Sequence, residues 1–313
     1  MAANHTIHGG DHRHLAWDNS TPPAMTVAPG DIVQFDDLDA TSGQLSATST
    51  VDDIRTLDFG LINPIAGPVY VDGAEPGDAL KVTLLEFIPN DWAWTAIVPG
   101  FGLLADDFPE AALHIWSYDN TFDNPGMYGD DARVPMKPFC GTIGVAPGEA
   151  GAFSTVPPTS SGGNMDIRDL SAGTELYLPV SVPGALFSIG DSHCAQGDGE
   201  VCGTAIESPL GAVVKFELSK GENLKFPRFV TPGPVTRHLD GKGYEVTTGI
   251  GPDLMVASKD AVRGMIDRLG ASRGLSAERA YMLCSVCADM RISEIVDIPN
   301  WVVSCYLPRI VFE

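Results

Sequence analysis

Basic residues are scarce in this sequence. Its 313 residues include 19 Lys and Arg against 41 Asp and Glu, which gives a formal net charge of −22. A surface this acidic repels nucleic acids, polyanionic ligands and anionic membranes. We therefore expect no nucleic-acid partner and no membrane partner, whereas a small neutral substrate and a metal cation are both compatible with the charge.

Long apolar runs are also missing. No run approaches the roughly 18 apolar residues that cross a bilayer, and no basic segment followed by an apolar one opens the chain. We expect a cytoplasmic protein whose six cysteines are reduced thiols. The only Cys-x-x-Cys pair, Cys284 and Cys287, is predicted to lie on a helix rather than in a zinc or redox site. Phosphate-binding glycine motifs are absent.

Turn-forming residues dominate instead, because 24 Pro and 34 Gly are scattered along the chain. Such spacing predicts many short strands joined by tight turns. Residues 26–35 and 73–87 each contain Pro-Gly-Asp followed by alternating apolar residues, and this repetition predicts two β-sandwich-like units. Helical periodicity occurs at 258–270 and 276–290. We predict a mainly β fold with a C-terminal α+β part, divided into a site-bearing region 1–210 and a closely packed region 211–313.

Chemically active side chains concentrate at 187–207, FSIGDSHCAQGDGEVCGTAIE. An apolar run ends there, and side chains two apart on a strand share a face, so Asp191 and His193 should point the same way. Gly197 and Gly199 flank Asp198 and would let the backbone turn its carboxylate back to that side. We predict Asp191, His193 and Asp198 as ligands of one divalent metal ion.

Oxygen and nitrogen donors of this kind suit zinc first, with manganese or iron as further possibilities. A calcium-binding acidic loop, or a plain turn between strands, is the alternative reading of the same residues. Glu200 and Glu207 lie just beyond the predicted ligands. A carboxylate that does not bind the metal can serve as a general base toward water, and we assign both glutamates catalytic roles.

The same segment resembles the signature of the acetamidase/formamidase family. Further blocks similar to that family follow the same order and extend the resemblance over nearly the whole chain: NPIAGPVYVDGAEPGDALKV at 63–82, PFCGTIGVAP at 138–147 and PPTSSGGNMD at 157–166. Cys194 stands where a small residue such as Ala is expected, and the length matches the shorter, acetamidase-like form. The resemblance implies hydrolysis of short aliphatic amides to a carboxylate and ammonia.

Four further residues are predicted to contact the substrate. Asn164 offers a donor and an acceptor that match an amide group. Asp166 follows it and could contact the leaving nitrogen, bind the metal or form an Asx turn. The remaining two are Gln196, inside the acidic cluster, and His14, in a segment similar to the opening strand of the family.

Two alternatives remain open at this level. Cys194 could be a nucleophile activated by His193, but neighbouring strand residues point to opposite faces. The cluster could also be a structural ion site in a non-catalytic metal-binding β protein. The aromatic-rich stretch 90–138 is expected to provide an apolar wall for a pocket that holds a very small amide. We expect a homo-oligomer.

Overall fold

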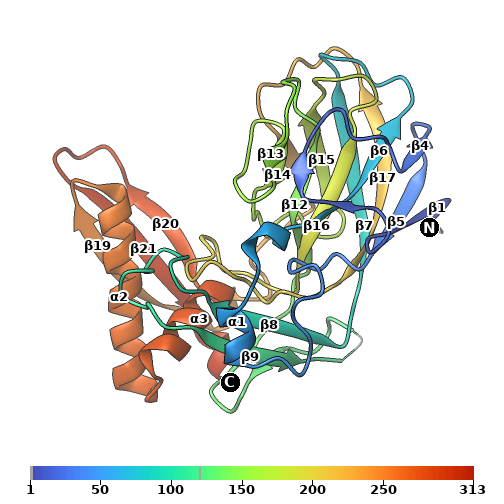
Figure 1. Ribbon diagram of the computed structural model, residues 1–313. Helices are drawn as coiled ribbons and strands as arrows, with labels where there is room; N and C mark the ends of the chain where they lie inside the picture. The colour runs from blue at the N-terminus through green and yellow to red at the C-terminus, as the bar shows by residue number, and fades with distance from the viewer. Residues whose placement is uncertain (1–2, 120) are drawn as a thin grey trace.

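The computed structural model describes residues 3–119 and 121–313. Strands hold 36% of the chain and helices 15%, which confirms the mainly β fold class. Two six-stranded sheets form most of the first 230 residues, and they are the arrowed layers beside the N-terminus in Figure 1. In spatial order, the first sheet contains β1 (His5–His8), β5 (Ile32–Asp36), β17 (Gly211–Ser219), β7 (Ala79–Ile88), β15 (Glu175–Pro179) and β18 (Arg228–Val230).

The second sheet has β16 at its centre. Its order is β14 (Gly162–Asn164), β12 (Phe139–Val145), β16 (Phe187–His193), β6 (Ile65–Val71) and β2 (Arg13–His14), with β4 (Met25–Val27) also paired to β6. Every residue of β16 is buried. A fully buried strand explains why 187–193 reads as an apolar run that ends in polar residues.

A shared apolar core joins the two sheets into one sandwich. Phe35 and Phe216 of the first sheet both contact Phe187 of the second, with ring centroids 6.0 and 5.0 Å apart and edge-to-face geometry. The two Pro-Gly-Asp strands, β5 and β7, belong to the same sheet and flank β17. The Pro-Gly-Asp repeat therefore marks two strands of the first sheet, and it does not distinguish the two sheets of the sandwich.

Shorter elements connect the sandwich to the rest of the chain. They are α1 (Val51–Arg55), η1 (Phe59–Leu61) and η2 (Asp240–Lys242), and the strand pairs β3 (Ala16–Trp17) with β13 (Phe153–Ser154), β8 (Trp92–Ile97) with β9 (Ala112–Ser117), and β10 (Gly126–Tyr128) with β11 (Ala132–Val134). The β8–β9 hairpin forms most of the aromatic stretch expected as a wall. Its backbone bonds to the site segment, because Trp94 and Glu207 exchange both amide hydrogen bonds at 2.8 Å.

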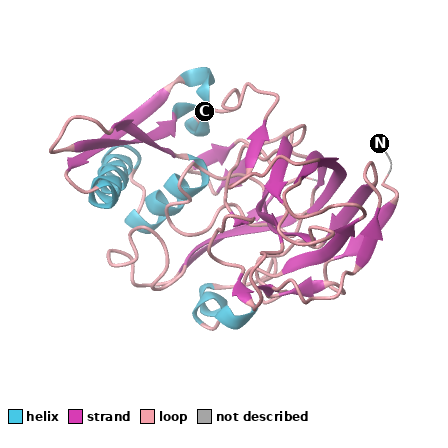
Figure 2. Ribbon diagram, turned by 90° about the horizontal axis from the view of Figure 1, so that it is seen from above, coloured by secondary structure: helices cyan, strands magenta, loops and turns pink. Residues whose placement is uncertain are grey.

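The C-terminal part is α+β, as predicted. Its sheet has the order β19 (Tyr244–Gly251), β21 (Trp301–Pro308) and β20 (Asp289–Glu294), and η3 (Arg309–Phe312) ends the chain. Helices α2 (Leu254–Arg273) and α3 (Ala277–Cys287) pack beside it, on the side of the molecule away from the N-terminus in Figure 2. Within the described part of the chain, no helix is both long and apolar enough to cross a membrane.

Helix boundaries follow their capping residues. The Ser276 side chain accepts a hydrogen bond from the amide of Arg279, so α3 begins where the sequence predicts. Helix α2 begins four residues earlier than expected, because the Asp253 side chain caps the amide of Val256. Cys284 and Cys287 both lie on α3, and all six cysteines are free and buried.

The predicted division at residue 210 separates β17 from the strands with which it pairs. β17 bonds to β5 and β7, so the sandwich continues through β18, and the C-terminal sheet starts with β19. A division by sheets would fall between β18 and β19.

A buried ion pair ties the two parts together beside the site segment. The Arg168 guanidinium, in the loop after β14, forms a two-pronged contact with Asp289 of β20, with the Nη2 to Oδ2 distance at 2.9 Å. Their side chains are 3% and 0% exposed. Such a pair costs desolvation when it forms, but removing one partner leaves an uncompensated buried charge.

We expect Arg168→Met to lower the free energy of unfolding by about 3 to 5 kcal/mol, because buried Asp289 would lose its two-pronged partner and keep only the Arg291 guanidinium, 3.5 Å away. Arg263→Met is the matched control, since Arg263 pairs with Asp107 at 2.6 Å on the surface. That exposed pair should contribute only about 0 to 1 kcal/mol. Denaturant titration of both variants measures the difference, and equal losses would contradict this account.

Candidate active site

Strand β16 carries the first two site residues. Asp191 and His193 are both buried, and their side chains converge as expected, with Asp191 Oδ1 3.2 Å from His193 Nε2. The backbone at Asp191 has a φ of 53°, in the left-handed region that Asp tolerates better than most residues. The strand therefore bends at the residue that aims a carboxylate at the histidine.

Two glutamates approach from the segment after β16. Glu207 Oε2 lies 3.0 Å from His193 Nε2 without an aligned hydrogen bond, while Glu207 Oε1 accepts from the amide of Ala205 at 2.8 Å. Glu200 sits in a tight turn with a φ of 43° and lines the same cavity as Glu207. Both residues predicted as catalytic thus lie at the site.

Asp166 completes the cluster from a distant part of the chain. It follows β14 directly, and β14 pairs with β12, the neighbour of β16. Its carboxylate forms a compact group with Asp191 and His193, in which one ligand atom of each residue lies within 4.8 Å of the others. His193, Glu200 and Glu207 form a second such group, so both groups converge on one imidazole.

Gln196 determines which nitrogen of His193 carries a proton. Gln196 Nε2 donates to the backbone oxygen of Asp166 at 2.8 Å, and a carbonyl oxygen can only accept. The other end of the amide, Oε1, therefore faces His193 Nδ1 at 3.1 Å. Because Oε1 also only accepts, Nδ1 must be protonated, and Nε2 faces Asp191 and Glu207.

Negative charge exceeds positive charge in this buried cluster. Burial raises the pKa of Asp166 to about 7, with a further contribution from Asp191. Burial, reinforced by Asp166, raises the pKa of Glu200 well above its usual range. Burial would lower the pKa of His193, but Glu207 and Asp191 together raise it well above its ordinary value. Each shift reflects carboxylates that need a cation or a proton beside them.

Two unpartnered oxygens and one glycine favour a cation over a proton as the group that compensates these carboxylates. Asp166 Oδ1 and Glu207 Oε2 are buried without hydrogen-bond partners among the described residues. Gly141 of β12 lies behind the cluster, and a β-carbon there would contact Asp166 Oδ1 and lie 2.8 Å from His193 Cε1 and 2.9 Å from Asp191 Oδ2. Carboxylate oxygens and an imidazole nitrogen gathered this tightly are a donor set that fits a divalent metal ion.

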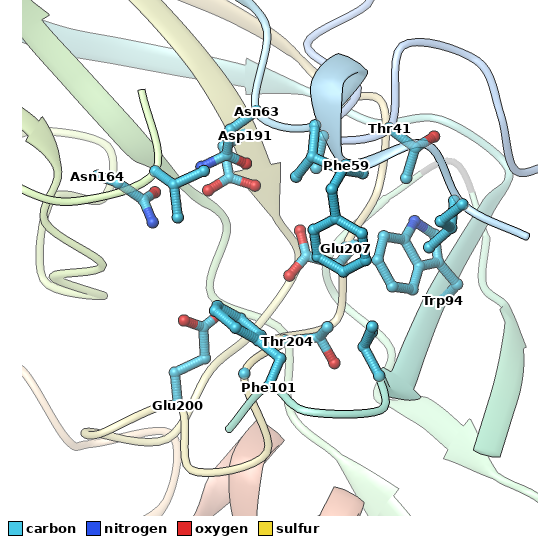
Figure 3. A pocket seen from close by; sticks show the side chains of 16 residues that line it. Thr41, Phe59, Asn63, Trp94, Phe101, Asn164, Asp191, Glu200, Thr204 and Glu207 are labelled. Atoms are coloured by element: carbon cyan, nitrogen blue, oxygen red, sulfur yellow. The ribbon is translucent and has the colours of Figure 1, made fainter. Parts of the chain in front are cut away.

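A cavity of about 160 Å³ opens beside the cluster. In Figure 3 the polar side chains of Asn164, Asp191 and Glu200 lie on one side of the view and Phe59 and Trp94 on the other. The lining residues are Ala40, Thr41, Leu57, Phe59, Ile62, Asn63, Trp94, Val98, Phe101, Val156, Asn164, Asp191, Glu200, Gly203, Thr204 and Glu207.

Three predicted site residues differ from their predicted roles. The Asp198 side chain is 49% exposed and lies 3.5 Å from Arg168 Nε, so the structure does not bring it to Asp191 and His193. His14 Nε2 bonds to Ser188 Oγ at 3.0 Å and does not line the cavity. Gln196 lies behind His193 rather than facing the cavity. Asn164 lines the cavity as predicted.

Sequence reasoning missed the wall contributed by 40–63. Phe59, Ile62 and Asn63 line the cavity from a segment without a recognisable motif. Asn63 alone gives a signal in the sequence, because it stands at the start of a block resembling the family. Trp94 and Phe101, which composition alone would assign to the core, also line the cavity.

Comparison with known proteins decides the family. The sequence model of the Acetamidase/Formamidase family matches residues 3–150 and 149–313. The chain belongs to the acetamidase/formamidase family. It is therefore an amidase, and the expectations of family and enzyme class are both confirmed.

The chain is similar to a formamidase, an acetamidase and a solved gamma lactamase over 66% or more of its length. It is 30% identical to a formamidase of Methylophilus methylotrophus, with 96% of this chain and 89% of that protein aligned. It is 32% identical to an acetamidase of Mycolicibacterium smegmatis over 66% of each chain. A solved gamma lactamase from Delftia acidovorans superimposes with a TM-score of 0.89 at 27% identity, covering 99% and 93% of the two chains.

The tight fit around Gly141 gives a direct test of the cluster. Gly141→Ala should reduce kcat/KM for amide hydrolysis by about 10²-fold, because the new methyl group displaces Asp166 and Asp191, and small misplacements cost that much. Gly251→Ala is the control, since a β-carbon at Gly251 meets no atom within 4 Å. Activity close to that of the parent enzyme in the folded Gly141 variant would show that the carboxylates need not be held so closely.

Proposed function

We propose that this amidase is a metal-dependent hydrolase of neutral amides, including the short aliphatic amides expected from the sequence. The observation that carries the metal dependence is the cluster of four carboxylates around the single buried imidazole of His193, in which Asp191 and Glu207 are buried and Asp166 and Glu200 are half-buried. Without a cation, that excess of negative charge has to be relieved by protonation. A divalent metal ion relieves it while leaving the carboxylates that bind it ionised.

Asp166, Asp191 and His193 are the proposed ligands. They form one compact group, Asp166 Oδ1 is buried without a partner, and the Gln196 contact leaves His193 Nε2 free to bind a metal ion. Asp166 takes the place that the sequence assigned to Asp198, since Asp198 pairs with Arg168. When bound, a zinc or manganese ion supplies polarisation of the substrate carbonyl and a lowered pKa for water.

The two glutamates are proposed to move protons. Hydrolysis forms a C–O bond to water, breaks the C–N bond and transfers a proton from water to the leaving nitrogen. Glu207 accepts the proton from water, since its Oε2 lies free at the cluster. Glu200 delivers a proton to the nitrogen, because its raised pKa keeps a proton available. Glu207 then passes the proton that it took from water to Glu200, which lines the same cavity, so both glutamates return to their starting states. A primary amide then yields a carboxylic acid and ammonia.

Asn164 is proposed to orient the substrate. Its Oδ1 accepts a hydrogen bond from Thr142 Oγ1 at 2.6 Å, so the NH2 end remains to donate to a substrate carbonyl. The side chain points into the cavity in Figure 3. Gln196 and His14 are not proposed to contact substrate, because neither lines the cavity.

A thiol mechanism is not supported. The Cys194 side chain is 0% exposed and does not line the cavity, and burial raises the pKa of its thiol to about 12. A nucleophilic cysteine needs a lowered pKa and access to substrate. The expected cytoplasmic location and homo-oligomer stay predictions.

Cyclic amides are a second candidate substrate class. The Delftia acidovorans neighbour is named a gamma lactamase, and the likeness to it covers 99% of this chain. A lactam is an amide whose carbonyl carbon and nitrogen are joined in a ring, so the same proton transfers apply.

Metal removal tests the proposal. Dialysis against a chelator should abolish amide hydrolysis, and zinc or manganese should restore it, because the carboxylates alone would hold protons rather than polarise a carbonyl. Elemental analysis before and after dialysis measures the metal content, and an assay of ammonia release on the same samples measures the activity. Full activity of protein with verified metal removal would contradict the mechanism.

Three variants separate ligands from proton carriers. Asp191→Asn should lose metal, because a neutral amide replaces an anionic donor. Glu200→Gln should keep metal and lose about 10² to 10⁴ in kcat, as a missing acid or base does. Asp198→Asn is the matched control and should keep its metal, since that carboxylate contacts Arg168. Metal loss in Asp198→Asn would instead restore it as a ligand.

A further inference from the structure

The cavity is larger than formamide or acetamide requires. Acetamide places a single methyl group beyond its carbonyl carbon. A protein cavity of about 150 Å³ lined by Leu, Ile and Phe holds a benzene molecule. The cavity here is about 160 Å³, so a substrate with one methyl group leaves most of it to water. The expectation of a pocket fitted to a very small amide therefore needs revision.

Most of this extra volume is enclosed by apolar side chains. They come from two segments that lie far apart in sequence and close on one another: Leu57, Phe59 and Ile62 from around η1, and Trp94, Val98 and Phe101 from β8 and the following loop. Trp94 is 5% exposed, whereas Phe59 and Phe101 are 56% and 43% exposed. The wall thus runs from a buried tryptophan to two half-exposed rings.

Phe101 is fixed against the segment that carries the glutamates. A β-carbon on Gly203 would lie 2.5 Å from Phe101 Cδ1, so the ring packs on the Gly203 backbone. Gly203 lies between Glu200 and Glu207 in the same loop. The apolar wall therefore has a set position relative to the proton-carrying side chains.

The charges of the cavity limit what can fill it. Asp191, Glu200 and Glu207 line it, and no Lys or Arg occurs among its described lining residues. With the amide group at the carboxylate end, an anionic group at the other end of the substrate would enter the apolar part of the cavity, where it would lose water without gaining a cationic partner. The apolar wall in turn gains contact area only from an uncharged, compact hydrocarbon group.

We propose that the preferred substrates are neutral amides whose carbonyl carbon carries a compact apolar group about the size of a benzene ring. This inference rests on the proposed function, because it uses the same site. The amide nitrogen faces the carboxylate end, and the hydrocarbon packs between Phe59 and Trp94. A primary amide and a lactam fused to a ring both present this chemistry.

A substrate series tests the proposal on the metal-loaded enzyme. We expect kcat/KM for benzamide to exceed that for acetamide by about 10-fold or more, since each methylene-sized group that fits an apolar pocket has at least that effect. 4-Carbamoylbenzoate has the same body with one carboxylate added and should be at least about 10-fold worse than benzamide. Isoindolin-1-one, the ring-fused lactam, distinguishes a cyclic from a linear substrate.

A matched pair of variants tests whether the wall is responsible. Phe59→Ala should lower the ratio of kcat/KM for benzamide to that for acetamide by about 10-fold, because the hydrocarbon loses one side of its pocket. Phe226→Ala removes a ring of 59% exposure that does not line the cavity, and it should leave the ratio unchanged. Line broadening of benzamide proton signals in the presence of Glu200→Gln protein measures binding without turnover.

The outcomes distinguish failure of this inference from failure of the proposed function. Hydrolysis of acetamide with equal or lower kcat/KM for both benzamide and isoindolin-1-one overturns the inference and leaves the amidase mechanism standing. An unchanged ratio in Phe59→Ala also overturns it. Absence of hydrolysis for every amide, with zinc or manganese bound, overturns the proposed function and the inference together. A higher kcat/KM for benzamide or isoindolin-1-one than for acetamide supports the inference, provided that Phe59→Ala removes this advantage.

Discussion

Burial of like charges at the end of a central strand is the constraint on which the rest of the structure depends. Asp191 and Glu207 converge on His193 where water is largely excluded, and half-buried Asp166 adds a third carboxylate whose Oδ1 is itself buried. Isolated buried carboxylates are costly, so they persist only where the surrounding fold holds them and a cation or proton compensates them. The two-sheet sandwich meets the first requirement by enclosing β16 between β12 and β6.

The C-terminal part packs against the loop of the site that contains Glu200. Gly197 packs against the backbone of Ala288, where a β-carbon would not fit, and its amide donates to Ser285 of α3 at 2.8 Å. The Cys202 amide also bonds to Ser285, through its hydroxyl, at 3.0 Å. Helix α3 thereby fixes both flanks of the loop that contains Glu200. An α+β part far along the chain thus holds the Glu200 loop in place without supplying a side chain to the described lining of the cavity.

Local sequence patterns were enough for the parts of the site that one strand or one turn controls. Alternation along 187–193 correctly paired Asp191 with His193, and the neighbouring glutamates lie at the cavity. Asp198 differs because its position depends on Arg168, which itself pairs with Asp289 of β20. No local pattern contains that competition, since the three residues meet only after the sandwich and the C-terminal sheet have packed.

Prediction of the fold from local sequence patterns has the same limit. Pro-Gly-Asp repeats and helical periodicity predicted strands and helices, and the class was correct, but the pairing of β17 between β5 and β7 joins segments about 130 residues or more apart along the chain. The cavity wall depends on similar long-range meetings, in this case between η1 and the loop after β8. Composition predicts apolar side chains, and only the topology determines which of them face a substrate.

The orientation of Gln196 has a consequence for how this enzyme can be dissected. Its amide is directional, and the end that faces His193 is selected by the main-chain carbonyl of Asp166. The tautomer of the site histidine is thus specified by a backbone atom, which every amino acid at position 166 would still provide. A survey of side-chain replacements at Asp166 would therefore report the loss of a carboxylate and overlook this second contribution. Only a change to the main chain itself, such as an ester in place of the amide that follows residue 166, would weaken that carbonyl as an acceptor and expose it.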